Sequence, residues 1–117
     1  MPVYGSLGPT AIVPGDNYVL FNGTETPASG TKSIAIARAE GAHDTGVMTF
    51  TVQFASSPTA TVSIEASNVD ADASYQTIYA GAGTQQDYYA DLGGFAFYRA
   101  NLSAYTSGGM PTVIVQR

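Results

Sequence analysis

Few residues in this chain of 117 amino acids could perform acid–base or nucleophilic chemistry. The single histidine, His43, lies next to Asp44 in the segment EGAHDTG, and the chain has no cysteine, which excludes thiolate chemistry and disulfides. A lone imidazole beside acidic residues is usually solvated, no second histidine could complete a metal pair, and no serine has the sequence context of a nucleophile elbow. We therefore expect no catalytic residues and no enzyme activity, and the sequence leaves open a pair of carboxylates that the fold brings together.

The segment SNVDADAS carries oxygen-bearing side chains at alternate positions, as the start of a calcium-binding loop does. These residues are Asn68, Asp70, Asp72 and Ser74. The EF-hand pattern then fails, because its sixth position is Ala73 instead of glycine and its twelfth is Tyr79 instead of glutamate. A turn capped by Asx side chains explains the same residues. We expect the turn and no cofactor, with Asn68, Asp70 and Asp72 as the ligands in the alternative case of a bound calcium ion.

Charge is scarce in this protein. Four lysine and arginine residues and nine acidic residues give a net charge of −5, and 11% of the chain is charged, against about a quarter in an average globular protein. Four cations are too few for the basic patch that nucleic-acid binding requires, and no apolar run approaches the roughly 20 residues of a membrane span. We therefore expect neither nucleic acid nor membrane as a partner. An uncharged surface fits a protein covered by neighbouring subunits, and it equally fits a neutral free domain.

The first 16 residues combine turn-forming and apolar residues. Proline and glycine recur through MPVYGSLGPTAIVPGD, which prevents a helix and any long strand. The apolar residues between them are Val3, Tyr4, Leu7, Ile12 and Val13. Because this segment is too apolar to be a solvated tail, we expect residues 1–16 to form an extended arm that packs on protein. The surface beneath the arm is either this domain's own sheet or a neighbouring subunit.

Alternating apolar and polar residues predict strands through the rest of the chain. The expected strands are 17–22, 32–38, 47–54, 60–67, 75–80, 86–92, 95–102 and 111–117, separated by segments rich in Gly, Pro, Asn, Asp and Ser. The clearest inward faces are Met48, Phe50, Val52 and Phe54 in one strand and Ala60, Val62, Ile64 and Ala66 in the next. About eight short strands predict an antiparallel, jelly-roll-like β-sandwich that forms one domain over residues 17–117.

Two strand pairings are predicted from short connections. The segment ASSPT between strands 47–54 and 60–67 is typical of a turn, with Pro58 inside it, so we expect these strands to form an antiparallel pair. The Gly93–Gly94 pair is typical of a tight hairpin, which would join strands 86–92 and 95–102.

Tyrosine is the remaining signal, with eight copies in the chain. Its large ring and polar tip favour interfaces. Tyr88 and Tyr89 are consecutive in a predicted strand, so their side chains point to opposite faces and we expect one of them to be exposed. An exposed tyrosine could stack on a sugar ring or contact a protein. The residues that we expect at a partner interface are Val3, Tyr4, Leu7, Ile12, Val13, Tyr88 and Tyr89.

The stretch TVSIEASNVDADASYQTIYA, followed by FAFYRANLSAYTSGGMPTVIVQR, resembles small β-sandwich proteins encoded in the structural modules of tailed bacteriophages. The resemblance covers about the second half of the chain and rests on strand and turn patterns. By size and architecture the chain is most similar to capsid cement or decoration proteins. Such proteins are jelly-roll-like, form oligomers on the outside of the shell and clamp neighbouring capsomers. The resemblance implies that the arm at 1–16 reaches a neighbour.

These observations together predict a non-enzymatic virion structural protein, made in the host cytoplasm, that binds the outside of a phage capsid at subunit junctions and stabilises the shell. The expected partners are the major capsid protein and further copies of this chain, as a dimer or trimer. The alternative is a carbohydrate-binding β-sandwich, or a tail or fibre component, used in adhesion to a host surface. The aromatic content and the calcium-like loop at 68–74 favour that alternative.

Overall fold

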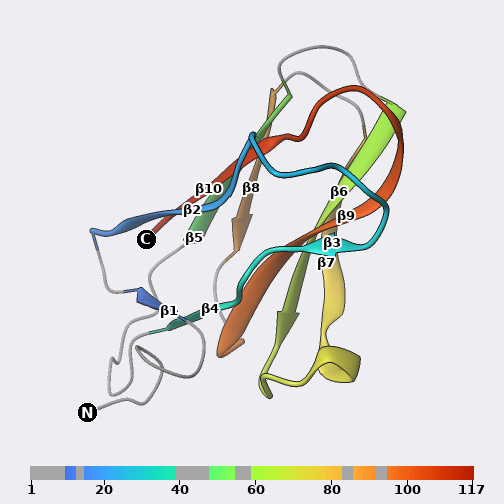
Figure 1. Cartoon of the computed structure of the whole chain (residues 1–117). Coiled ribbons are helices and arrows are strands. Elements are labelled where there is room, and N and C mark those ends of the chain that lie inside the picture. Colours follow the sequence, from blue (N-terminus) through green and yellow to red (C-terminus); the bar gives the residue numbers. More distant parts are fainter. Residues whose placement is uncertain (1–9, 13–14, 39–47, 55–58, 83–85, 92–94) are drawn as a thin grey trace.

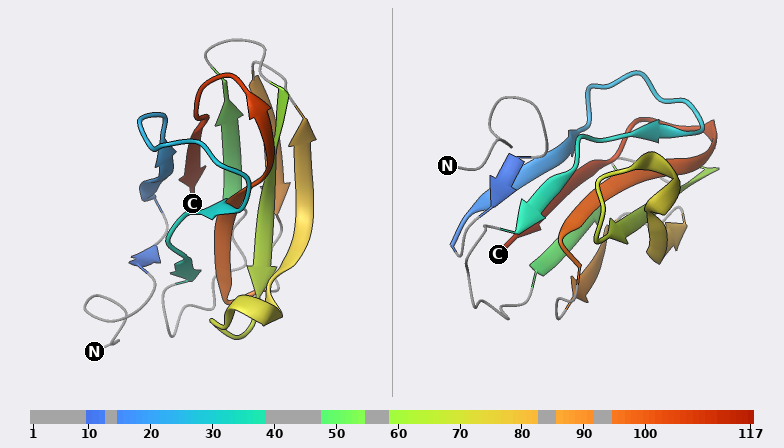
Figure 2. Two further views of the ribbon diagram at one scale, coloured as in Figure 1. Left: turned by 45° about the vertical axis from the view of Figure 1, so that its right-hand side comes forward. Right: turned by 90° about the horizontal axis from the view of Figure 1, so that it is seen from below.

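The computed structural model describes residues 10–12, 15–38, 48–54, 59–82, 86–91 and 95–117, which form two β-sheets packed face to face (Figure 1, Figure 2). Sheet A has the strand order β1-β4-β9-β6-β7, with β3 also paired to β9, and sheet B has the order β2-β10-β5-β8. The predicted all-β sandwich is therefore confirmed. The strands are β1 (Thr10–Ile12), β2 (Asn17–Asn22), β3 (Thr31–Lys32), β4 (Ile36–Arg38), β5 (Met48–Gln53), β6 (Thr59–Ser67), β7 (Gln76–Ala82), β8 (Gln86–Asp91), β9 (Phe97–Ser107) and β10 (Thr112–Gln116).

The pairings within each sheet are antiparallel, apart from the parallel pair of β1 with β4. The helical element of the described residues is η1 (Asp72–Ser74), one turn of 3-10 helix between β6 and β7. In this part of the chain there is no helix with the length and apolar character needed to span a membrane.

The core forms where the alternating strands turn their apolar faces toward each other. Met48, Phe50 and Val52 of β5 are at most 1% exposed. Phe50 of sheet B meets Tyr98 of sheet A with ring centroids 5.6 Å apart, so the two layers are in direct aromatic contact. The inward faces predicted from alternation are confirmed in both strands: the buried set includes Met48, Phe50, Val52, Phe54, Ala60, Val62, Ile64 and Ala66.

The two predicted hairpins are wrong. β5 pairs with β8 and β10 in sheet B, whereas β6 pairs with β7 and β9 in sheet A. The strands on either side of the Gly93–Gly94 pair, β8 and β9, also lie in opposite sheets. Each of these strands has an apolar face, and that face is buried by a strand of the facing sheet, not by a neighbour in its own sheet. The connections themselves, residues 55–58 and 92–94, lie outside the described residues.

The predicted strand at 32–38 is two strands, because β3 and β4 pair with β9 in registers that differ by one residue. Between β3 and β4, Ser33 forms the hydrogen bonds to β9. Its N–H donates to the Ala100 carbonyl at 2.8 Å, and its hydroxyl oxygen accepts the Ala100 N–H at 2.9 Å. The interruption leaves Ile34 outside the ladder and 56% exposed.

Residues 10–12 belong to the sandwich and not to a separate arm. β1 pairs with β4, and Ile12 is 1% exposed within the core. Arg117 fixes the same segment, because its Nη1 donates to the Ile12 carbonyl and its backbone pairs with Gly15 and Asp16. For Ile12 the own-sheet alternative therefore holds, and its buried side chain is not available to a partner. The other expected contacts of the arm, Val3, Tyr4, Leu7 and Val13, lie outside the described residues.

We predict that Ile12→Ala lowers the free energy of unfolding by about 2–4 kcal/mol, because it removes buried carbon atoms and leaves a cavity. Val19→Ala, at a 47% exposed position of β2, is the control and should change that free energy by about 0.5 kcal/mol or less. Urea denaturation monitored by tyrosine fluorescence measures both variants. Equally small losses would show that β1 does not contribute to the core.

Candidate functional site

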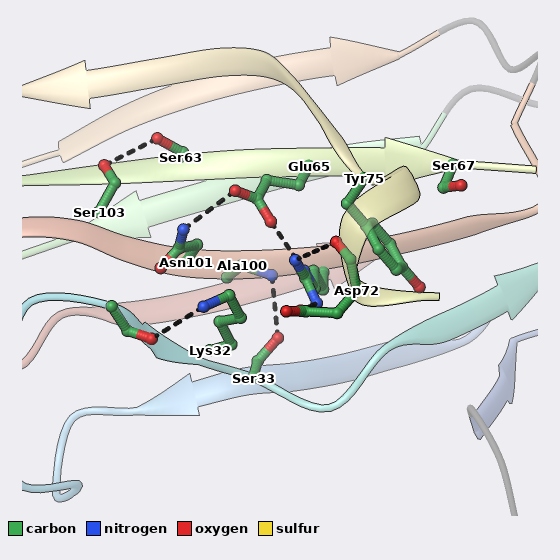
Figure 3. A network of polar contacts seen from close by, with 12 residues as sticks. Lys32, Ser33, Ser63, Glu65, Ser67, Asp72, Tyr75, Ala100, Asn101 and Ser103 are labelled. Carbon is green, nitrogen blue, oxygen red and sulfur yellow. Dashed lines mark hydrogen bonds and ion pairs between the residues drawn. The ribbon is translucent and has the colours of Figure 1, made fainter. Parts of the chain in front are cut away.

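A polar network occupies the outer face of sheet A (Figure 3). At its centre, Arg99 of β9 lies directly opposite Glu65 of β6 in the antiparallel ladder. Arg99 Nε donates to Glu65 Oε1 at 2.7 Å, and Arg99 Nη1 donates to Asp72 Oδ1 at 2.6 Å. Asn101, two residues along β9, donates its side-chain amide to Glu65 Oε2 at 3.0 Å. Both carboxylate oxygens of Glu65 are therefore occupied within the chain.

The turn that contains η1 closes over this network. The Tyr75 ring centroid lies 4.0 Å from the guanidinium carbon of Arg99, which is a cation–π contact. The Tyr75 hydroxyl donates to Asp70 Oδ1 at 2.8 Å. Glu65 and Arg99 are consequently 8% and 9% exposed although they lie on the outer face of the sheet.

The charges of this network stabilise one another. The hydrogen bond from Arg99 and its positive charge lower the pKa of Asp72. Burial opposes ionisation of Arg99, but its hydrogen bonds to Glu65 and Asp72 outweigh burial and raise the pKa of the guanidinium. Burial raises the pKa of the Tyr75 hydroxyl, and the hydrogen bond to Asp70 raises it further, so this hydroxyl stays protonated. With its charges paired internally, the network acts as a clasp that holds the 70–75 turn on the sheet.

The residues of the calcium-like segment use their oxygens for this architecture. Asn68 Oδ1 accepts the Ala96 N–H at 3.1 Å, while Asp70 and Asp72 accept from Tyr75 and Arg99. These three side chains therefore bind three different parts of the chain instead of converging on a common centre. Within the described ranges, no group of three or more His, Cys, Asp or Glu residues could hold a metal ion. The structure thus shows a turn here, as the first alternative predicted, but Asn68, Asp70 and Asp72 do not cap it. Ser67 Oγ accepts the Val69 N–H at 3.0 Å, and η1 begins after Ala71 without a side-chain cap.

The outer face of sheet B has a different character. Across the ladder, Val19 of β2 lies opposite Ile114 of β10, and Ile114 lies opposite Thr51 of β5. The same register places uncharged residues above and below this row. We call the set the neutral face; its described members are Asn17, Val19, Asn22, Thr49, Thr51, Gln53, Ala90, Thr112, Ile114 and Gln116. None of these ten positions carries a charge, although the chain has a net charge of −5.

An open pocket lies at one end of the neutral face. It is lined by Asn22, Gly23, Gln53, Met110 and Thr112. Met110 is 5% exposed and supplies a buried apolar contact. Gly23 has a φ of +89°, a backbone conformation that favours glycine. A Cβ at this position would lie 3.1 Å from Thr112 Oγ1 and would crowd the pocket. Amide and hydroxyl groups beside an apolar floor are suited to a neutral, hydroxyl-rich ligand.

The two tyrosines predicted at an interface differ in their surroundings. Tyr89 packs inward, with its ring 5.1 Å from that of Tyr79 and 6.2 Å from that of Phe50. It therefore closes the side of the sandwich between β7 and β8, and it is not an outward partner contact. Tyr88 occupies the ladder position opposite Thr51, and its side chain lies outside the described set. His43 also lies outside the described residues.

Both surfaces were missed as sites at the level of the sequence, for different reasons. The neutral face had a signal: the polar positions of NYVLFN, MTFTVQ and TVIVQ contain no charged residue. The Glu65–Arg99 pair had none, because the two residues are 34 positions apart and meet only through the β6–β9 register.

The chain was also compared with protein-family models, curated proteins and solved structures, and none of them matches. The fold and surfaces define an all-β sandwich with one clasped and one neutral outer face.

We predict that Glu65→Gln lowers the free energy of unfolding by about 3 kcal/mol, because it leaves the buried Arg99 charge without its main partner. The double variant Glu65→Leu with Arg99→Met replaces the pair by apolar groups and should recover most of that loss. Urea denaturation gives both values. A loss below about 0.5 kcal/mol for Glu65→Gln, as is typical of an exposed ion pair, would show that the clasp is not buried in solution.

Proposed function

We propose that this protein is a non-enzymatic structural protein that binds the outside of a tailed-phage capsid at subunit junctions and stabilises the shell. The observation that carries the proposal is the neutral face. Ten described positions on the outer face of one sheet are free of charge in an acidic chain. Depletion of charge is what distinguishes the buried centre of a protein interface from the rest of a surface.

The residue types of the neutral face are suited to contact with another protein. Removing threonine, asparagine and glutamine side chains from water costs less free energy than removing ionised groups. These side chains can also form hydrogen bonds with a partner. Val19 and Ile114 add apolar area, which contributes about 25 cal/mol for each Å² buried. One such contact is modest, but a shell repeats it by symmetry, so subunits that bind at several points gain from multivalency.

The choice of a phage shell follows from the resemblance of the second half of the sequence to capsid decoration proteins. The partner is then the major capsid protein and the location is the virion surface. The clasped face fits this arrangement, because the charges of Arg99, Glu65 and Asp72 are paired within the chain and this face can point to solvent while the neutral face is covered.

We predict that the chain is present in purified particles at a simple ratio to the major capsid protein, measured by quantitative mass spectrometry. Thr51→Lys, in the middle of the neutral face, should weaken attachment to shells that lack the protein by about tenfold or more, because it buries an unpaired charge. Ala104→Lys, exposed on β9 of sheet A, is the matched control and should attach normally. Undiminished attachment of Thr51→Lys would remove the neutral face as the contact, and absence from particles would overturn the virion role.

The pocket beside Gly23 favours a second candidate function, which is binding of a neutral carbohydrate in host-surface adhesion. Its lining combines amide, hydroxyl and apolar groups without a charged side chain. Sugars present hydroxyl groups and apolar ring faces, and such a lining could contact both.

If this second function is correct, neutral oligosaccharides should shift the amide resonances of Asn22, Gly23 and Gln53 in a nuclear magnetic resonance titration. Thr112→Val keeps the shape of the side chain and removes its hydroxyl, so it should weaken binding by about three- to tenfold, the value of one hydrogen bond. Resonances that stay unchanged at millimolar concentrations of the sugars would exclude the carbohydrate function for this pocket.

A further inference from the structure

The outer edges of the two sheets are protected unequally. β1 is three residues long, and β8 carries Asp87 and Asp91. At the end of β2, the Glu25 carboxylate accepts the N–H groups of Asn22 and Gly23 at 3.0 and 3.1 Å. Short length and charged groups are devices by which proteins prevent strands of other molecules from adding to an edge. β3 (Thr31–Lys32), which pairs with β9 alone, is two residues long and includes a lysine. Four of the five edge strands in the described sheets therefore carry such a device.

The fifth edge strand, β7, is neither short nor charged. Its sequence QTIYAGA spans seven residues and has neither a charged residue nor a proline. Among the described strands it pairs with β6 alone, and Figure 2 shows it at the margin of the molecule. A register shift at Ile78 interrupts the ladder, and residues Tyr79–Ala82 then pair regularly with β6. Among the described residues, this regular half of β7 has no strand on its other side, so that side of its backbone can pair with another strand.

We infer that β7 pairs with β7 of a second copy of this chain, in antiparallel orientation about a two-fold axis near Ala80. Two strands with the same sequence are self-complementary in such an isologous contact. Each copy has a net charge of −5, so two copies approach best where neither carries charge. β7 meets that condition over its whole length, which favours a second copy over a charged partner.

The acidic turn determines the orientation. Asp70 and Asp72 lie in the turn that precedes β7, close to its first residue, Gln76. Antiparallel pairing places the turns of the two copies at opposite ends of the new contact. Parallel pairing would bring the four carboxylates together, and like charges in contact are unfavourable.

The dimer has a consequence for attachment, which rests on the proposed function. The two-fold axis of an antiparallel pair is perpendicular to the sheet, so sheet A continues from one copy to the other and both copies of sheet B lie on the same side. The two neutral faces then point in one direction, and the dimer can bind a surface at two points.

Sedimentation velocity over a range of protein concentrations tests the dimer without any capsid. The wild-type chain of 12.1 kDa should show a reversible species of twice that mass. Ala80→Lys places two ammonium groups close to the axis and should raise the dissociation constant by about tenfold or more. Ala104→Lys introduces the same exposed charge on β9, an inner strand of sheet A, and should dimerise like the wild type.

Hydrogen exchange of the wild-type protein provides a readout that does not depend on the folding of a variant. The amides of residues 79–82 should become more protected as the concentration rises, while those of β2 should not. A wild-type chain that stays monomeric at hundreds of micromolar would overturn the inference. A dimer that tolerates Ala80→Lys, or whose β7 amides exchange as in the monomer, would also overturn it, whatever the result of the capsid experiment.

Discussion

The burial of one apolar face of each sheet against the other is the interaction on which the rest of the structure depends. Phe50 and Tyr98, both fully buried, meet across the two layers. Because side chains alternate along a strand, each residue placed in the core fixes the outward position of its neighbours. A slip of one residue would exchange core and surface along the whole strand. The clasp and the neutral face are thus both set by the register that buries the core.

The polar side chains on the two outer faces differ in where they find their partners. On sheet A, Arg99, Glu65 and the 70–75 turn pair with one another, so this face is closed by the chain itself. On sheet B, the outward threonine, asparagine and glutamine side chains carry no charge, and Asn17, Asn22, Gln53 and Gln116 are exposed. The sandwich therefore has one face whose charges are paired within the chain and one face whose uncharged polar groups can exchange water for a partner.

The sequence predicts the strands well because alternation is a local property. Residues 17–22 form a strand with the predicted bounds, and Met48, Phe50 and Val52 face the core as expected. Alternation tells which face of a strand is buried, but it does not tell which strand lies beside it, so the two short connections at ASSPT and Gly93–Gly94 were misinterpreted as hairpins. The clasp was unpredictable for the same reason, since Glu65 and Arg99 become neighbours only through long-range pairing. The absence of charge on the neutral face was visible in the sequence, but its clustering required the register.

The position of β10 has a consequence for how the chain acquires its structure during synthesis. β10 lies between β2 and β5, and within sheet B it is the partner through which β2 joins the sheet. A ribosome makes β10 only after β3 to β9, so Leu20 and Phe21 of β2 have no strand partner in sheet B until all the other described strands have been made. Until then sheet A can form its β6–β9 pair but has an incomplete opposing layer. Completion of the sandwich is therefore a late event, governed by slow long-range pairing, and the nascent chain exposes apolar surface until β10 has been made.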